Sequence, residues 1–195
     1  MIRPRTAVLF AALAITAVSL AGCASGTPAG TPTATVTVTV APTPSPTPTP
    51  TPTESTKTAV FPTDCGAIGT AATRQATVDA MTLQGDGTGF VRPVPDGATL
   101  KLGCDWIEGE AVGILLLISE ATPAAVTAAV AALPAQGYTC STARAGNPLC
   151  TMTVPGKPAD AVETIYARDN VWIYMSAVNI DGGQLLSDLA VQMWP

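Results

Sequence analysis

Histidine is absent from this chain of 195 residues, and charged residues make up only 12% of it. Without histidine, the Ser-His-Asp and Cys-His arrangements that activate a nucleophile cannot be built. Zinc is disfavoured too, because its sites use closely spaced cysteines and histidines, and no two cysteines here follow the C-x₂-C spacing. A Ser/Lys pair has few candidates among three lysines. We therefore expect no enzyme activity, no metal and no cofactor.

Positive charge is also scarce. Nine basic residues face fourteen acidic ones, and two of the basic residues, Arg3 and Arg5, lie at the very start of the chain. Binding to nucleic acid needs clustered lysines and arginines that neutralise phosphates, whereas the cations here are spread thinly. Nucleic acid is therefore not an expected partner.

The start of the chain carries the clearest motif. Its positive residues precede an apolar run over 7–20, which is too short to span a bilayer and ends at Leu20-Ala21-Gly22-Cys23. This tetrad resembles the lipobox of bacterial lipoproteins. The resemblance implies that 1–22 is a signal peptide and that Cys23 carries diacylglycerol, which anchors the protein to the outer face of the cytoplasmic membrane. An ordinary secretory signal with an incidental cysteine is the alternative.

Threonine and proline dominate residues 23–59, which contain almost no large apolar side chains. Such a segment cannot form a core and favours polyproline II, which rises about 3.1 Å per residue and would reach on the order of 100 Å when extended. Thr35–Val40 alternates like a strand but lies between prolines with no neighbour to pair with. We expect a lipid-anchored, disordered stalk that exposes the rest of the chain to the cell wall.

Residues 60–195 are long enough for a single globular α+β domain. Four cysteines remain there, an even number in an exported protein, and they predict two disulfides. Three pairings are possible. We favour Cys140–Cys150, because Gly146-Asn147-Pro148 between them is typical of a turn, and this leaves Cys65 for Cys104.

Hydrophobic periodicity predicts an antiparallel sheet of about five strands with helices on one face. The expected strands cover 99–106, 111–119, 150–154, 161–168 and 171–178. The continuous apolar centre of 111–119 suits a strand that is flanked on both sides. The expected helices are one from Thr122 to 133, one over about 183–194, and one over 65–74 capped by Asp64, while 84–89 is expected to be a flexible loop.

A two-residue turn at Asp169-Asn170 would set the register of the last hairpin and pair Arg168 with Val171. One face of this hairpin is then aliphatic and suits the helices. The other face gathers Trp172 and Tyr174, which are our candidates for an open, ligand-binding contact surface. In the alternative, Trp172 packs under a loop or a second layer.

Two other groups of residues carry weaker signals. Asp105 with Glu108 or Glu110 could form a pair of carboxylates that cleaves glycosides, although charged residues at a hairpin turn are ordinarily solvated. Asp86-Gly87-Thr88-Gly89 hints at calcium but lacks the repeated acids of a loop site.

The order of a cysteine-headed helix, Cys104-Asp105-Trp106 and a further cysteine pair resembles uncharacterised lipoprotein domains of actinobacteria. This resemblance supports location and fold class and implies no functional residue. We therefore expect a non-catalytic binding or interaction module of the envelope, with an envelope protein or a glycan as partner. An envelope enzyme that acts through carboxylates is the alternative, and converging carboxylates in a deep pocket would favour it.

Overall fold

The computed structural model describes residues 58–157 and 159–195, apart from the side chain of Arg144. The expected signal peptide over 1–22, Cys23 and most of the expected stalk lie outside the described residues. Within the described part of the chain, no helix is long and apolar enough to cross a membrane.

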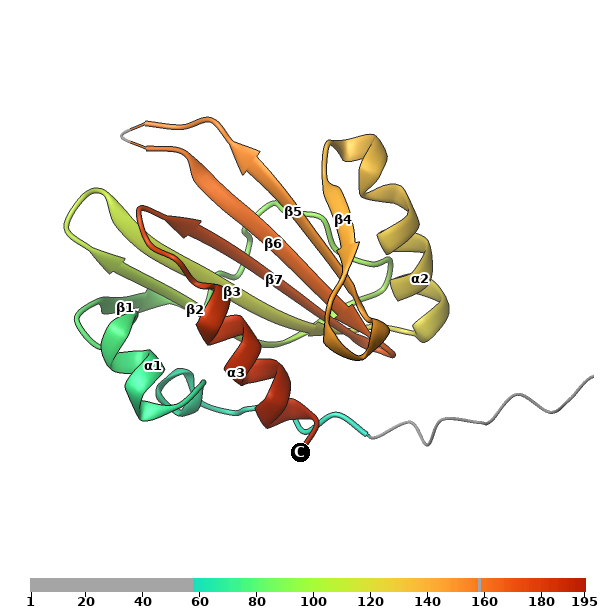
Figure 1. Ribbon diagram of the computed structural model, residues 1–195, viewed down its shortest axis with the longest axis horizontal. Helices are drawn as coiled ribbons and strands as arrows, with labels where there is room; N and C mark the ends of the chain where they lie inside the picture. Colours follow the sequence, from blue (N-terminus) through green and yellow to red (C-terminus); the bar gives the residue numbers. More distant parts are fainter. Residues whose placement is uncertain (1–57, 158) are drawn as a thin grey trace, which may run out of the picture. The chain divides into compact units, whose positions relative to one another are not determined.

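The sheet has seven strands, all antiparallel to their neighbours, in the order β1-β2-β3-β7-β6-β5-β4 (Figure 1). The strands are β1 (Thr82–Gly85), β2 (Thr99–Glu108), β3 (Val112–Glu120), β4 (Thr139–Thr142), β5 (Pro148–Val154), β6 (Ala161–Arg168) and β7 (Val171–Val178). The antiparallel α+β fold agrees with the sequence, but the expected count of about five strands is too low. The strands that were not expected, β1 and β4, are four-residue edge strands, and runs this short show too little alternation to be recognised.

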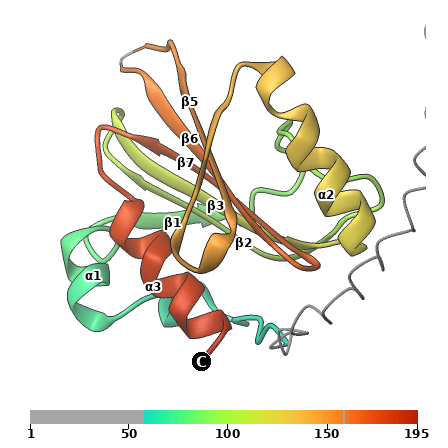
Figure 2. The ribbon, with the colours of Figure 1, turned by 45° about the vertical axis from the view of Figure 1, so that its right-hand side comes forward.

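Helices cover both faces of the sheet, so the expectation of helices on one face is wrong (Figure 2). The helices α1 (Ala71–Ala76) and α3 (Gly183–Met193) contact each other on one face, and α2 (Pro123–Ala132) packs on the other. Three short 3₁₀ turns are η1 (Cys65–Ala67), η2 (Pro134–Gln136) and η3 (Arg144–Gly146).

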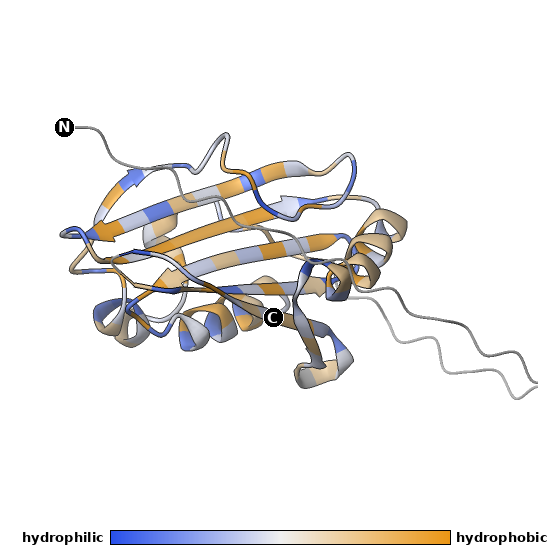
Figure 3. Cartoon of the chain, turned by 90° about the horizontal axis from the view of Figure 1, so that it is seen from above, coloured by the Kyte–Doolittle hydropathy of each residue, from blue (hydrophilic) through white to orange (hydrophobic). Residues whose placement is uncertain are grey.

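The central strand β3 explains why two layers are needed. Ile114, Leu116 and Ile118 point to the α3 face, while Leu115 and Leu117 point to the α2 face, and all five are buried. Successive side chains of a strand alternate between the faces, so a strand that is apolar throughout must be covered twice. Figure 3 shows hydrophobic segments along the inner strands of the sheet.

The caps explain where the helices begin. The Thr122 hydroxyl accepts a hydrogen bond from the Ala125 amide, 3.2 Å away, so α2 begins as expected. The helix expected over 65–74 is instead divided into η1 and α1. Gly69 between them has a φ of 70°, which lies outside the right-handed helical region.

The last hairpin has the expected register. β6 and β7 coincide with the two apolar runs of the sequence, Arg168 pairs with Val171, and Ala167 pairs with Trp172. Asp169 in the turn has a φ of 53°, a left-handed conformation that Asp tolerates better than most residues.

Both disulfides have the expected pairing. Cys65–Cys104 fastens η1 to β2, and Cys140–Cys150 joins two residues that face each other across β4 and β5. The Cys104 and Cys150 side chains lie in the hydrophobic cores on opposite faces of the sheet. One disulfide therefore fastens η1 to the sheet, and the other joins the edge strand β4 to its neighbour β5.

Candidate functional site

Trp172 and Tyr174, the expected contact surface, lie in the interior of the protein. Their exposed fractions are 0% and 2%, and both belong to the core beneath α2. The indole Nε1 of Trp172 donates a hydrogen bond to the main-chain oxygen of Pro93, 3.1 Å away. The β1–β2 loop therefore covers this face together with α2. The expectation of an open contact surface is wrong, and the alternative in which Trp172 packs under a loop is confirmed.

Tyr174 belongs to a small polar cluster inside this layer. The hydroxyl of Tyr138 donates a hydrogen bond to the Glu163 carboxylate, and the hydroxyl of Tyr174 lies close enough to interact with the same carboxylate. Burial, and then the interaction with Glu163, raises the pKa of both tyrosines well above the ordinary value. Both hydroxyls therefore remain protonated donors at neutral pH, and the cluster satisfies a carboxylate at the edge of the core.

The carboxylates considered in the sequence do not converge. Asp105 and Glu108 are three residues apart on β2, so their side chains leave on opposite faces of the sheet. Glu110 lies exposed in the turn that follows. Asp86 accepts a hydrogen bond from the Thr88 amide at 2.9 Å, which lowers the pKa of Asp86. Over the described residues, no group of three or more His, Cys, Asp or Glu could hold a metal ion.

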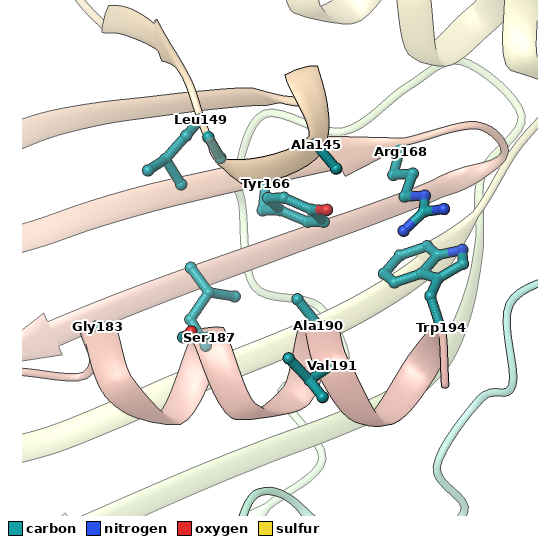
Figure 4. Close-up of a pocket in the computed structure, with 11 residues that line it drawn as sticks. Ala145, Leu149, Tyr166, Arg168, Gly183, Ser187, Ala190, Val191 and Trp194 are labelled. Carbon is teal, nitrogen blue, oxygen red and sulfur yellow. The ribbon is translucent and has the colours of Figure 1, made fainter. Parts of the chain in front are cut away.

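A groove of about 340 Å³ lies between α3 and the β4–β5 connection (Figure 4). One wall comes from α3, the opposite wall comes from residues 143–149, and side chains of β6 lie between them. The groove is lined by Ala143, Ala145, Leu149, Tyr166, Arg168, Gly183, Leu186, Ser187, Ala190, Val191 and Trp194. Its surface is largely apolar, with polar groups from few residues.

Three aromatic and cationic side chains meet at one end of this groove. The guanidinium carbon of Arg168 lies 4.6 Å from the ring centroid of Trp194. The ring of Tyr166 meets the same indole edge-on, with 6.0 Å between the centroids. Burial raises the pKa of Tyr166, and the neighbouring Arg168 cation opposes this rise. The Arg168 side chain retains 22% exposure, so the cation remains accessible.

Local structure holds these side chains in place. Arg168 is the last residue of β6, where the tight turn begins, and the Trp194 amide donates to the Ala190 oxygen at the end of α3. In the opposite wall, Ala145 has a φ of 65°, a left-handed conformation that costs energy for a residue with a Cβ atom. Gly146, the next residue, also has a positive φ, of 80°, so this conformation belongs to the turn that joins β4 to β5.

This groove was not predicted from the sequence. Arg168 precedes the predicted turn and Trp194 follows the apolar stripe of the last helix, but no local pattern relates the two. The β4–β5 connection that forms the second wall had no predicted structure beyond a turn. The site exists only through the packing of three segments.

No known protein family, curated protein or solved structure shows a significant match to this chain. The functional interpretation therefore rests on the residues and geometry of the groove.

Proposed function

We propose that this protein is a lipid-anchored, non-catalytic binding module of the cell envelope, and that the groove beside α3 is its binding site. The anchor is supported by the resemblance of Leu20-Ala21-Gly22-Cys23 to a lipobox. The Thr/Pro-rich segment over 23–59 would hold the domain away from the outer face of the cytoplasmic membrane, exposed to the cell wall. Binding is supported by one observation, which is the apolar groove with a cation at its end.

The composition of the groove favours binding over chemistry. Of the eleven described residues that line the groove, only Arg168 is charged. An arginine stays protonated and cannot act as a general base near neutral pH. Largely apolar walls with few convergent polar groups are typical of ligand sites, and the volume is within their usual range. The alternative, an enzyme that acts through carboxylates, gains no support from Asp105 and Glu108, which lie on opposite faces of β2.

A ligand screen with matched variants tests the groove. The full processed chain in lipid nanodiscs is screened against small amphipathic compounds by thermal shift, because a ligand that binds only the folded state raises the melting temperature. Ser187→Phe places a ring in the groove, and Ala131→Phe places the same ring on an exposed position of α2. We expect compounds that stabilise the wild type and Ala131→Phe but not Ser187→Phe. Compounds that stabilise all three equally, or no stabilising compound at all, would reject the groove.

A second experiment tests the anchor. Replacement of Cys23 by alanine removes the only thiol of the lipobox, so the protein should lose its lipid and leave the membrane fraction. Mass spectrometry of the wild type should show diacylglycerol on Cys23. An unlipidated wild type, or a Cys23→Ala protein that stays in the membrane with unchanged mass, would refute the anchor.

A further inference from the structure

Arg168 has more hydrogen-bonding capacity than its protein neighbours use. Its Nε lies 3.6 Å from the nearest Asp169 oxygen, which is an ion pair but too long for a hydrogen bond. The Tyr166 hydroxyl lies nearby and can accept from it. A guanidinium carries five N–H donors in one plane, more than these two neighbours can satisfy. Within the described part of the chain, these neighbours leave N–H donors of Arg168 available for a further acceptor.

The contact with Trp194 holds this cation at the end of the groove. The guanidinium carbon lies over the indole, 4.6 Å from the ring centroid, and a cation–π contact of this kind leaves the N–H groups at the edge of the planar guanidinium available to acceptors. Two parallel N–H bonds from such an edge match the two oxygens of a carboxylate. Among the described residues that line the groove, Arg168 is the charged one, and a cation in largely apolar surroundings favours an anionic ligand group.

The walls of the groove combine apolar side chains with polar groups. Leu149, Leu186 and Ala190 offer apolar surface, and the Ser187 hydroxyl and the main chain of the strained turn lie beside them. A peptide carries the same alternation, since amide groups and side chains succeed one another along the chain. A hydrocarbon chain would leave these polar groups without partners, and a sugar would find few partners for its own hydroxyls.

Arg168 lies over Trp194 at one end of the groove, next to the apolar wall formed by α3. From this juxtaposition we infer that the groove binds the carboxyl-terminal end of a peptide. Arg168 holds the terminal carboxylate in a bidentate contact, and the walls hold the last one or two side chains, which are apolar. The volume of about 340 Å³ accommodates on the order of two residues. This inference rests on the proposed function and adds the chemical class of the ligand.

Calorimetry with the full processed chain in nanodiscs tests this assignment with three probes. The first is acetyl-alanyl-leucine with a free carboxylate, the second is its carboxamide, and the third is octanoate, a carboxylate without a peptide. The wild type should bind the peptide acid at least tenfold more tightly than either of the others. Arg168→Met should abolish the preference for acid over amide, and Arg168→Lys should keep part of it, because a point charge cannot form the bidentate contact.

Circular dichroism and the melting temperature establish that both Arg168 variants are folded. Equal binding of acid and amide, an Arg168→Met variant that keeps the preference, or no binding of the acid at millimolar concentration would each overturn the peptide assignment. Octanoate that binds as tightly as the peptide acid would overturn it in favour of free organic acids. None of these results would reject the proposed function if other compounds still raise the melting temperature of the wild type but not that of Ser187→Phe.

Discussion

A Cβ atom on Gly103 would lie only 1.8 Å from the main-chain oxygen of Asp86. The loop that follows β1 therefore rests directly on the backbone of β2. The same loop continues to Pro93, whose main-chain oxygen accepts the indole N–H of Trp172. The close approach at Gly103 is thus one of the contacts that keep the α2 face of the sheet covered.

Gly103→Ala should displace this loop and destabilise the protein. Overpacking of this kind costs about 1–3 kcal/mol, because main-chain atoms must move. Urea unfolding measures the loss, and Gly85→Ala is the control, since a Cβ there meets no atom within 4 Å. In a Trp106→Phe, Trp194→Phe background, acrylamide should also quench Trp172 more strongly after Gly103→Ala. Equal stability of the two alanine variants would show that the loop does not depend on Gly103.

The elements with strong local patterns were predictable from the sequence. The runs over 161–168 and 171–178 flank an Asp-Asn turn and became β6 and β7 without a shift. Thr122 followed by Pro123 marked the start of α2. In each case the signal lies within a few neighbouring residues, through side-chain alternation, a tight turn or a cap.

The number of layers was harder to predict. The apolar run in β3 indicated a strand flanked on both sides, but not which segments would cover each face. Two of those segments are the loop before β2 and the helix α2. The sequence of neither segment indicates which face of the sheet it packs against. The burial of Trp172 follows from that long-range packing, so inspection of the hairpin alone suggested an exposed surface.

The candidate site was beyond sequence reasoning for the same reason. Arg168 and Trp194 are separated by a whole strand and a helix, and they meet only because α3 folds back across β6 and β7. The opposite wall depends on the left-handed turn at Ala145, where the residue type itself gives no warning of a positive φ.

The two disulfides should contribute unequally to stability. They join residues separated by 39 and by 10 positions in the sequence. In the chain-entropy account, the longer loop gives about 1 kcal/mol more stabilisation. Urea unfolding of Cys65→Ala/Cys104→Ala should therefore show the larger loss, compared with Cys140→Ala/Cys150→Ala. If the short-loop variant lost as much or more, packing around the cysteines would outweigh chain entropy.

The junction of α1 and α3 should weaken in acid. Asp188 Oδ2 accepts hydrogen bonds from the Thr73 hydroxyl at 2.5 Å and from the Thr70 hydroxyl at 3.0 Å. The bond from Thr73 foremost, and then one from the Gln184 side chain, lower the pKa of Asp188 to about 2 from the ordinary 3.8. Because the folded-state pKa is depressed, the stabilisation is present above roughly pH 4 and is lost as the pH falls towards 2.

Asp188→Asn removes this titration. The variant should be less stable than the wild type at pH 6, and the difference in melting temperature should shrink as the pH falls from 4 to 2. Asp96→Asn, a change at an exposed carboxylate, is the control and should follow the wild-type curve. A stability difference that stays constant over this range would exclude Asp188 as the titrating group.

The Glu163 cluster permits a double-mutant cycle. The Tyr138 hydroxyl donates to this carboxylate and the Tyr174 hydroxyl interacts with it, so Glu163→Gln weakens two contacts whereas Tyr138→Phe removes one. Hydrogen bonds to charged groups contribute about 1.5–3 kcal/mol each, so Tyr138→Phe should cost an amount in this range and Glu163→Gln should cost more.

In the Glu163→Gln background, Tyr138→Phe should lower the free energy of unfolding by less than it does in the wild type, because the acceptor carboxylate is already gone. The difference between the two costs, measured by urea unfolding, is the coupling energy between Tyr138 and Glu163, and we expect it to exceed about 0.5 kcal/mol. Ser141→Ala applied in both backgrounds is the control, since Ser141 lies exposed on β4 and should give strictly additive effects. Additive costs for Tyr138→Phe as well would mean that the hydroxyl and the carboxylate do not interact in solution.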